Sequence, residues 1–207
     1  MVHTVALTLI RHGATINNER NVYQGWLNSP LLPSEVDRLR RIKHQYPKPH
    51  YVISSDLTRC LETAKLLFSH HEIEMSENFR EFHFGDFEGK TYEQLKDDKT
   101  YQKWLEDPFL HRPPNGESIK MFTKRIQDGW DGLHSKFLDG VREITVVSHS
   151  GVIRHLLEMY APHKKTFWDW IIPFGGGYRL VTTREKLGRG ERCISLSEVP
   201  LTEKENG

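Results

Sequence analysis

The feature that most constrains the fold is an apolar run near the N-terminus, 5–10, which ends in Arg11, His12 and Gly13. A short run of this kind, bounded by a turn signal, is typical of a buried strand. Such a strand delivers a guanidinium, an imidazole and a flexible turn to one edge of a sheet. A guanidinium binds phosphate oxygens and an imidazole attacks phosphorus, so this edge has the groups needed to hold and attack a phosphoryl group.

A second apolar run, 144–148, repeats the design. It ends in His149 and Ser150, and a helical pattern of apolar residues follows over 152–160. In open α/β sheets, ligands bind beyond the carboxyl ends of the strands. We therefore expect His149 and His12 to face one site, although they are far apart in the sequence.

Alternating helices and strands are predicted in the rest of the chain. Apolar positions of 57–68 fall on one helical face, which places Arg59 in the first turn of a helix capped by Ser55 or Asp56. The last two predicted strands flank glycine-rich residues 188–190 and are expected to form a β-hairpin. The predicted strands are 51–54, 73–75, 178–183 and 193–199, and the other predicted helices are 34–46, 91–95, 101–106 and 119–137.

Size and charge favour one globular domain over residues 1–207. The chain is 37% hydrophobic and 28% charged, which suits a core large enough to enclose a buried sheet. Lys and Arg number 29 against 28 Asp and Glu, and this balance argues against nucleic acid or an anionic membrane as the main partner. The N-terminus leads into the first strand without a signal-peptide pattern, so a cytoplasmic location is expected.

Phosphoryl transfer requires a nucleophile, donors for the non-bridging oxygens and a proton for the departing oxygen. Arg11 and Arg59 offer planar forks of donors that match phosphate oxygens, and His149 offers one more hydrogen bond. His12 must instead present an unprotonated ring nitrogen to phosphorus. A hydrogen bond from its other ring nitrogen to a backbone carbonyl near Gly13 would fix that tautomer.

Five segments of the chain resemble motifs of the histidine phosphatase superfamily, the phosphoglycerate-mutase-like enzymes. They occur in the family's order and cover roughly the first three quarters of the sequence. The segments are LIRHGATINN at 9–18 with 24–25 and 29–31, SSDLTRCLETA at 54–64, REFHFGDFEG at 80–89, GES at 116–118 and VSHSGVIR at 147–154.

The resemblance implies a role for each main residue of the site. His12 becomes phosphorylated, and Arg11, Arg59 and His149 form the phosphate pocket. Glu81 is the proton donor when the alkoxide departs, and its carboxylate then takes a proton from the water that attacks phosphohistidine.

The resemblance also implies the fold and the surroundings of the site. The fold is an α/β class, three-layer α/β/α sandwich with a mostly parallel central sheet. Asn18, Gln24, Gly25 and Ser150 are expected to contact the substrate. No metal and no other cofactor is expected.

The identity of the acid stays open on the residues alone. Asp86 or Glu88 are alternatives to Glu81, which in that case would pair with Arg80 or another surface cation. A metal site is disfavoured, because the twelve histidines include no HExxH pattern.

The substrate is expected to be a small organic phosphomonoester. Mutases of the family usually have a longer chain with an insertion after the acid segment. In this 207-residue chain the insertion is expected to be short or absent, so water should reach phosphohistidine, which favours hydrolysis. Four short segments resemble alpha-ribazole phosphatases of cobalamin biosynthesis and related broad-specificity phosphatases: 84–89, Trp104, 107–108 and 113–118. This resemblance makes alpha-ribazole 5'-phosphate the leading candidate substrate. The alternatives are a phosphoglycerate mutase-type isomerase and a non-catalytic phospholigand-binding protein.

Two further points stay open at this level. The aromatic segment 167–174 fits a wall of the substrate cleft, which would favour an apolar leaving group, and equally fits a core or subunit contact. The oligomeric state, monomer or dimer, is not determined by the sequence.

Overall fold

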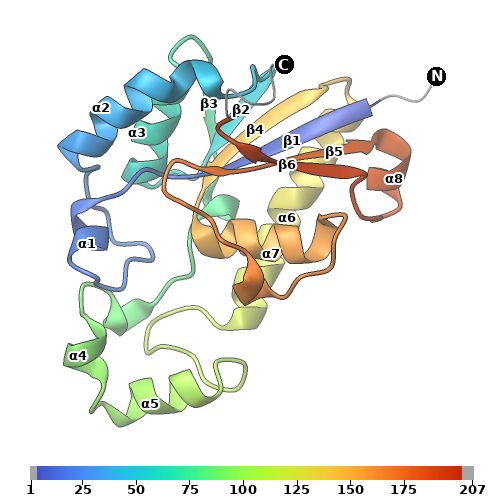
Figure 1. Ribbon diagram of the computed structural model, residues 1–207. Coiled ribbons are helices and arrows are strands. Elements are labelled where there is room, and N and C mark those ends of the chain that lie inside the picture. The colour runs from blue at the N-terminus through green and yellow to red at the C-terminus, as the bar shows by residue number, and fades with distance from the viewer. Residues whose placement is uncertain (1–3, 202–207) are drawn as a thin grey trace.

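A six-stranded sheet forms the centre of the structure, a computed structural model that describes residues 4–201 (Figure 1). Its strands are β1 (Thr4–Arg11), β2 (Tyr51–Ser54), β3 (Ile73–Met75), β4 (Glu143–Ser148), β5 (Gly177–Thr183) and β6 (Ser195–Val199). They lie in the order β3-β2-β4-β1-β5-β6. β3, β2, β4 and β1 are parallel, whereas β5 is antiparallel to both of its neighbours. The expected mostly parallel sheet is confirmed.

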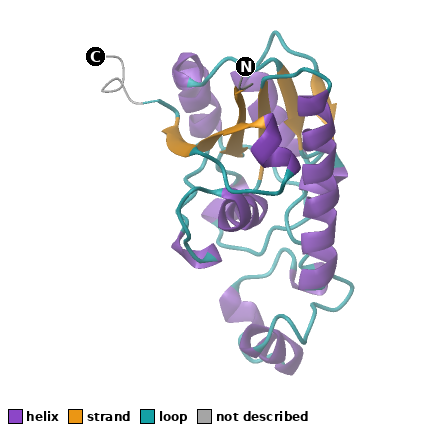
Figure 2. Ribbon diagram, turned by 90° about the vertical axis from the view of Figure 1, so that its right-hand side faces the viewer, coloured by secondary structure: helices purple, strands orange, loops and turns teal. Residues whose placement is uncertain are grey.

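Helices cover both faces of this sheet, so the expected three-layer arrangement is confirmed as well (Figure 2). The helices are α1 (Ile16–Glu19), α2 (Pro33–Ile42), α3 (Thr58–Leu67), α4 (Tyr92–Leu95), α5 (Lys99–Glu106), α6 (Ile119–Leu138), α7 (Ser150–Tyr160) and α8 (Arg184–Gly188). α4 and α5 lie away from the sheet, at the lower end of Figure 1. No helix within residues 4–201 combines the length and the apolar character needed to cross a membrane.

The alternation of side chains along the strands separates two apolar cores. Leu9 and Val146 belong to the core that includes residues of α6 and α7. Their neighbours Ile10 and Val147 belong to the core that includes residues of α2 and α3. Because successive side chains of a strand point to opposite faces, a strand buried on both faces must be apolar at nearly every position. This explains why the runs that end at the two histidines are continuous.

The register of the central strands brings their carboxyl ends together. Arg11 of β1 lies opposite Ser148 of β4, and Ser54 of β2 lies opposite Val147 of the same strand. The backbone N–H of His12 donates to the carbonyl of Ser148 at 2.9 Å, which extends the ladder by one residue. The residues that follow β1, β2 and β4 therefore start from one edge of the sheet.

Leu39 of α2 packs under the turn that carries His12. A Cβ on Gly13 would lie 2.9 Å from Leu39 Cδ1, and one on Gly175 would lie 2.8 Å from Leu39 Cδ2. We expect Leu39→Ala to lower the free energy of unfolding by about 2–5 kcal/mol, because a buried side chain is lost and a cavity is left. Urea denaturation measures this loss. Arg41→Ala, on the exposed face of the same helix, should change it by less than about 0.5 kcal/mol, and equal losses would contradict the packing argument.

Two local predictions are wrong. β5 and β6 pair as expected, but the connection between them is α8 rather than a turn at 188–190 alone, because the Thr183 side chain accepts from Lys186 N–H and starts a helix. The residue that caps α3 is Leu57, without a side-chain hydrogen bond, rather than Ser55 or Asp56. The Ser55 hydroxyl instead lies against the His149 ring, and the Asp56 carboxylate pairs with Arg80.

Candidate active site

His12 is nearly buried, with 4% of its surface exposed, directly after β1. Its Nδ1 lies 2.7 Å from the carbonyl oxygen of Gly13, and because a carbonyl only accepts, Nδ1 carries the proton. Nε2 therefore presents a lone pair, as the sequence analysis predicts. Burial, together with the positive charges of Arg59 and Arg11, holds the pKa of His12 well below its usual value, so the ring is neutral at neutral pH.

Arg59 is completely buried in the first turn of α3. Its Nε donates to His12 Nε2 at 3.2 Å, and its Nη2 donates to His149 Nδ1 at 3.1 Å. Nη1 donates to the carbonyl of Leu27 at 3.1 Å, and Nη2 also donates to the carbonyl of Gly25 at 2.7 Å. One guanidinium thus links both histidines to the loop before α2.

His149 is also completely buried, between β4 and α7. Because its Nδ1 accepts from Arg59, its Nε2 carries the proton and lies 2.9 Å from Ser55 Oγ and 3.3 Å from Cys60 Sγ. Burial, followed by the charge of Arg59, lowers its pKa well below the usual value. The ring centroids of His149 and His12 are 5.1 Å apart, so the structure brings the two histidines together.

Arg11 reaches the same place from the end of β1. Its Nη1 donates to the carbonyl of Ile172 at 2.8 Å, and its Cζ lies 3.7 Å from the ring centroid of Phe174. Burial lowers its pKa to about 10, and the carboxylate of Glu81 opposes that shift. Its Nε is buried and has no protein partner among residues 4–201. A buried donor without a partner is rare and is suited to an incoming anion.

The carboxylate of Glu81 binds the first turn of α7, the helix that follows His149. Its Oε2 accepts from the N–H of Gly151 at 3.0 Å, and its Oε1 accepts from the N–H of Phe82 at 2.9 Å. A Cβ on Gly151 would lie 2.3 Å from Oε1, so this approach requires glycine. Arg80 pairs with Asp56 and not with Glu81.

The two alternative acids hold other parts of the chain. Asp86 is exposed and accepts from the side-chain amide of Asn115 at 3.1 Å. Glu88 accepts from the backbone N–H groups of Trp26 and Leu27 at 2.8 and 2.5 Å, and from that of Phe84 at 3.2 Å. Among the three carboxylates, Glu81 is the one that binds the first turn of α7, and its charge opposes the lowering of the pKa of Arg11.

Two of the expected substrate contacts, Asn18 and Gln24, form side-chain hydrogen bonds to nearby Thr15. Asn18 Oδ1 accepts from the N–H and hydroxyl of Thr15 at 3.0 and 2.9 Å, which caps α1. Gln24 Oε1 accepts from the same hydroxyl at 2.8 Å. Gly25 contributes its carbonyl to Arg59, and Ser150 is the first residue of α7.

Sequence reasoning missed the residues that fix the Glu81 backbone. The indole Nε1 of Trp26 donates to the Glu81 carbonyl at 3.0 Å, and Arg125 Nη2 donates to it at 3.2 Å. Arg125 in turn forms a buried ion pair with Glu117 at 2.9 Å. The Gly-Glu-Ser motif at 116–118 was the sequence signal that could have pointed to Arg125, because its glutamate, Glu117, is the ion-pair partner of Arg125.

Different residues of the aromatic segment 167–174 lie in different surroundings. Trp170 is buried, with 1% exposed, and belongs to the core, whereas Trp168 is 77% exposed. Phe174 lies against the site, with its ring centroid 5.9 Å from that of His12.

The sequence around the cluster matches a known family. The sequence pattern of the histidine phosphatase superfamily (branch 1) matches residues 7–188 of the 207-residue chain. The chain belongs to this superfamily. The matched range contains every residue of the cluster described above.

Relatives of this histidine phosphatase carry more than one name. An adenosylcobalamin/alpha-ribazole phosphatase from Escherichia coli is 30% identical over 157 residues, which are 73% of this chain and 76% of the relative. A 2,3-bisphosphoglycerate-dependent phosphoglycerate mutase from Tropheryma whipplei is 26% identical over 181 residues, 73% of this chain and 81% of the relative. The crystal structure of the alpha-ribazole phosphatase from Shigella flexneri has a TM-score of 0.75 and 24% identity, covering 85% of this chain and 89% of that chain, and it supports the fold alone.

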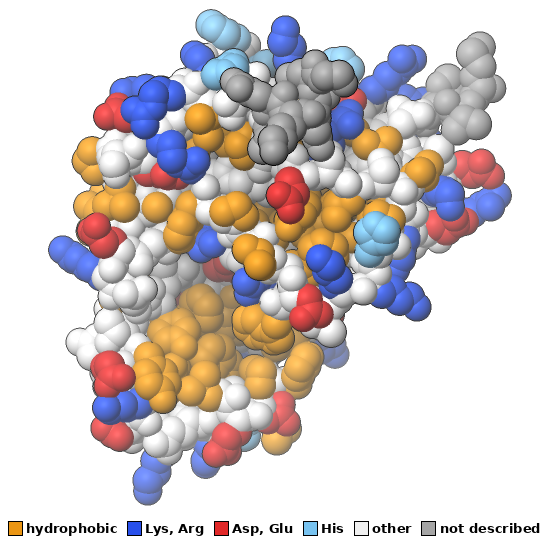
Figure 3. All heavy atoms as spheres, in the orientation of Figure 1, with side chains coloured by type: hydrophobic (Ala, Val, Ile, Leu, Met, Phe, Trp, Pro, Cys, Tyr) orange, Lys and Arg blue, Asp and Glu red, His pale blue; other side chains and the backbone are white. Residues whose placement is uncertain are grey.

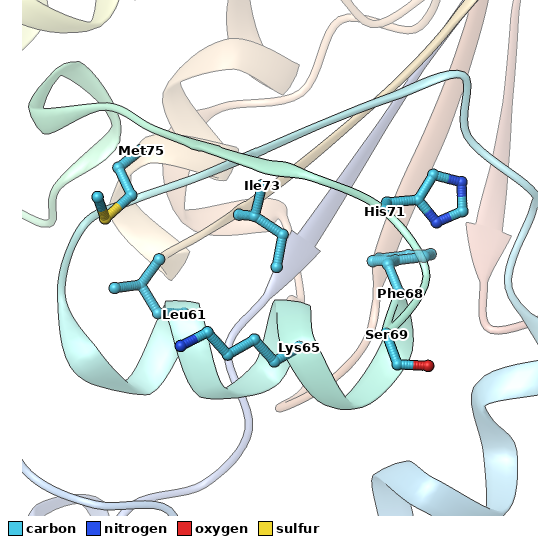
Figure 4. Close-up of a pocket in the computed structure, with 7 residues that line it drawn as sticks. All are labelled: Leu61, Lys65, Phe68, Ser69, His71, Ile73 and Met75. Carbon is cyan, nitrogen blue, oxygen red and sulfur yellow. The ribbon is translucent and has the colours of Figure 1, made fainter.

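A separate cavity of about 520 Å³ lies between α3 and β3 of the phosphatase (Figure 4). Leu61 and Lys65 line it from the helix, and Ile73 and Met75 line it from the strand. None of the expected site residues lines this cavity. Within residues 4–201, no group of three or more His, Cys, Asp or Glu side chains is arranged to hold a metal ion.

The neutral, buried histidines of the phosphatase should make its stability depend on pH. His12 and His149 have pKa values lowered in the folded state, so the unfolded chain binds protons that the folded chain does not as pH falls below about 6.5. We expect each imidazole to reduce the free energy of unfolding by about 1.4 kcal/mol between about pH 7.5 and about pH 5.5. Urea denaturation of the wild type and of His12→Asn at both pH values tests this. In the variant, the change in the free energy of unfolding between these pH values should be smaller by the contribution of one imidazole. An unchanged pH dependence in the variant would contradict a neutral His12.

Proposed function

We propose that this histidine phosphatase hydrolyses small organic phosphomonoesters through a phosphohistidine on Nε2 of His12. One observation carries the proposal. Nε2 holds a lone pair, because Nδ1 donates to the Gly13 carbonyl, and the nearest cationic donor is the buried guanidinium of Arg59 at 3.2 Å. A nucleophile fixed in one tautomer beside a phosphate-binding cation is the arrangement that phosphoryl transfer needs.

In the first step, the Nε–H of Arg59 shifts its hydrogen bond from His12 Nε2 to a phosphoryl oxygen. The freed lone pair of Nε2 forms a bond to phosphorus, and the bond from phosphorus to the ester oxygen breaks. Glu81, in its protonated form, gives its proton to the departing alkoxide. The leaving alcohol then diffuses away. The Nδ1–H bond to the Gly13 carbonyl stabilises the positive charge that the ring acquires.

In the second step, water attacks the phosphorus of phosphohistidine and the bond to Nε2 breaks. The Glu81 carboxylate takes a proton from this water, which returns the acid to its starting form. Inorganic phosphate leaves, and His12 regains its lone pair. One carboxylate thus serves both steps.

We assign the phosphate pocket to Arg11, Arg59 and His149. His149 acts there through Arg59, because its Nδ1 accepts from that guanidinium and its Nε2 faces Ser55 and Cys60. The unpartnered Nε of Arg11 and the Nε of Arg59 are the donors that support this assignment. Asn18 lies in α1, which follows β1, and Ser150 begins α7, which follows β4; we assign both residues to the rim of the pocket.

For the substrate, alpha-ribazole 5'-phosphate is the leading candidate. Its support is the motif resemblance and the relative from E. coli that carries the name of this activity. The relative named as a mutase keeps phosphoglycerate isomerisation as the second candidate.

A panel of phosphorylated compounds tests the proposal: alpha-ribazole phosphate, phosphoglycerates, sugar phosphates, nucleotides and an aryl phosphate. We expect phosphate release that depends on His12, with one compound preferred. Interconversion of phosphoglycerates faster than phosphate release would replace hydrolysis with the mutase reaction. Binding of orthovanadate without any turnover of the panel would replace it with ligand binding alone.

A further inference from the structure

Glu88 binds the backbone of the loop segment 25–27, which also contacts Arg59. It follows the short 3-10 turn Gly85–Phe87, and its side chain is only 12% exposed. Its Oε1 accepts from the N–H of Trp26 at 2.8 Å, and its Oε2 accepts from the N–H of Leu27 at 2.5 Å. Both carboxylate oxygens are therefore committed to two successive peptide groups of the loop.

The same peptide groups lead to Arg59. The N–H of Trp26 and the carbonyl of Gly25 belong to one peptide unit, and that carbonyl accepts from Arg59 Nη2 at 2.7 Å. In a planar trans peptide the N–H and C=O point in opposite directions. By binding the N–H on one side, Glu88 aims the carbonyl at Arg59 on the other side. Hydrogen bonds chained through one peptide also strengthen each other.

The next residue of the loop contacts the same two side chains, but through two different peptide units. Leu27 donates its N–H to Glu88 and accepts from Arg59 Nη1 at its carbonyl, at 3.1 Å. Carbonyls thus bind the guanidinium at both terminal nitrogens: Glu88 fixes the peptide plane of the Gly25 carbonyl directly, and it anchors Leu27 through the N–H of that residue. Its remaining Nε is the group that faces His12 Nε2.

Close packing leaves little freedom in this arrangement. A Cβ on Gly25 would lie 2.5 Å from Glu88 Oε1 and 2.2 Å from the carbonyl of Phe82. Burial lowers the pKa of Arg59, and the carboxylates of Glu81 and Glu88 oppose the shift, so Glu88 also acts on the guanidinium as a charge.

We propose that Glu88 is a positioning residue for phosphoryl transfer. It orients the loop carbonyls that aim the Arg59 guanidinium at the phosphoryl group on His12. This inference rests on the proposed function, in which Arg59 binds that group. It assigns to Glu88 a role through Arg59 and no contact with the substrate.

The affinity for orthovanadate, an analogue of the transferring phosphoryl group, tests this role in a double-mutant cycle of Glu88→Ala and Arg59→Ala. We expect Glu88→Ala to weaken vanadate binding about tenfold in the wild type and to cause no further loss in the Arg59→Ala protein, because coupled residues do not add. A merely structural role would give losses that multiply. Multiplying losses, or an unchanged affinity in Glu88→Ala, would overturn the proposal.

Glu88→Gln keeps the proposal testable if the alanine variant does not fold. Glutamine retains one carbonyl acceptor for the loop, but its amide NH2 faces the second N–H and it carries no charge. We expect vanadate affinity at least about threefold below that of the wild type, and wild-type affinity would overturn the proposal. Asp86→Asn is the matched control in the same segment and should bind vanadate like the wild type; a loss equal to that of Glu88→Ala would attribute the effect to the segment as a whole and overturn the proposal.

Measurements on the wild type distinguish failure of the proposed function from failure of the role of Glu88. If it binds vanadate and releases phosphate in a His12-dependent manner while Glu88→Ala does the same with equal affinity, only the role of Glu88 is lost. If the wild type neither binds vanadate nor hydrolyses a phosphate ester, the proposed function fails and the role of Glu88 falls with it.

Discussion

His12→Asn should lower kcat for an aryl phosphate by at least about ten-thousand-fold, because it removes the ring nitrogen that bonds to phosphorus in the proposed mechanism. Within residues 4–201, Arg59 donates to that atom, Nε2, and no carboxylate contacts it. Asparagine keeps a polar group beside the Gly13 carbonyl, so the fold should be retained. Steady-state rates on nitrophenyl phosphate measure the effect.

His155→Asn is the matched control for this substitution. His155 lies on α7, partly buried, and has no hydrogen bond to the cluster around Arg59. It makes the same chemical change without touching Nε2 of His12. A wild-type rate in His12→Asn, or an equal loss in both variants, would remove His12 from the mechanism.

Glu81→Gln should lower kcat by about a hundredfold to ten-thousandfold on an alkyl phosphate, the usual range for losing a positioned acid. The loss in the first step should be smaller on nitrophenyl phosphate, because nitrophenolate leaves without a proton. Since Glu81 also takes the proton from water in the second step, we expect a burst of nitrophenolate followed by slow turnover. Rapid-mixing kinetics separate the two phases.

Asp86→Asn tests the alternative acid by the same kinetics. Its carboxylate accepts from Asn115 on the exposed surface, so we expect rates near those of the wild type on both substrates. If Asp86→Asn showed the leaving-group dependence and Glu81→Gln did not, the two residues would exchange roles.

The central part of the site could be predicted from the sequence because it depends on strand ends. Continuous apolar runs identify the buried strands β1 and β4, and the parallel register then places the residues after them at one edge. The tautomer of His12 was predictable for a local reason, since its partner is the carbonyl of the next residue, Gly13. Arg59 followed from helical periodicity, which sets the first turn of α3.

The partners of Arg59 and His149 could not be predicted in the same way. Gly25 and Leu27 bind Arg59 through backbone carbonyls, which no residue type reveals, in a loop without hydrophobic periodicity. The hydroxyl of Ser55 resembles a helix cap in the sequence, yet tertiary packing places it against the His149 ring. Long-range contacts override the local capping preference here.

The account depends most directly on the formation of phosphohistidine at His12. The decisive measurement quenches the protein in base during turnover of a phosphate ester and maps the phosphoryl group by peptide mass spectrometry. We predict an acid-labile phosphoryl group on the peptide that contains His12, formed and lost at rates compatible with kcat and absent in His12→Asn. Turnover with no phosphoprotein, or with the phosphoryl group on a different residue, would contradict the account.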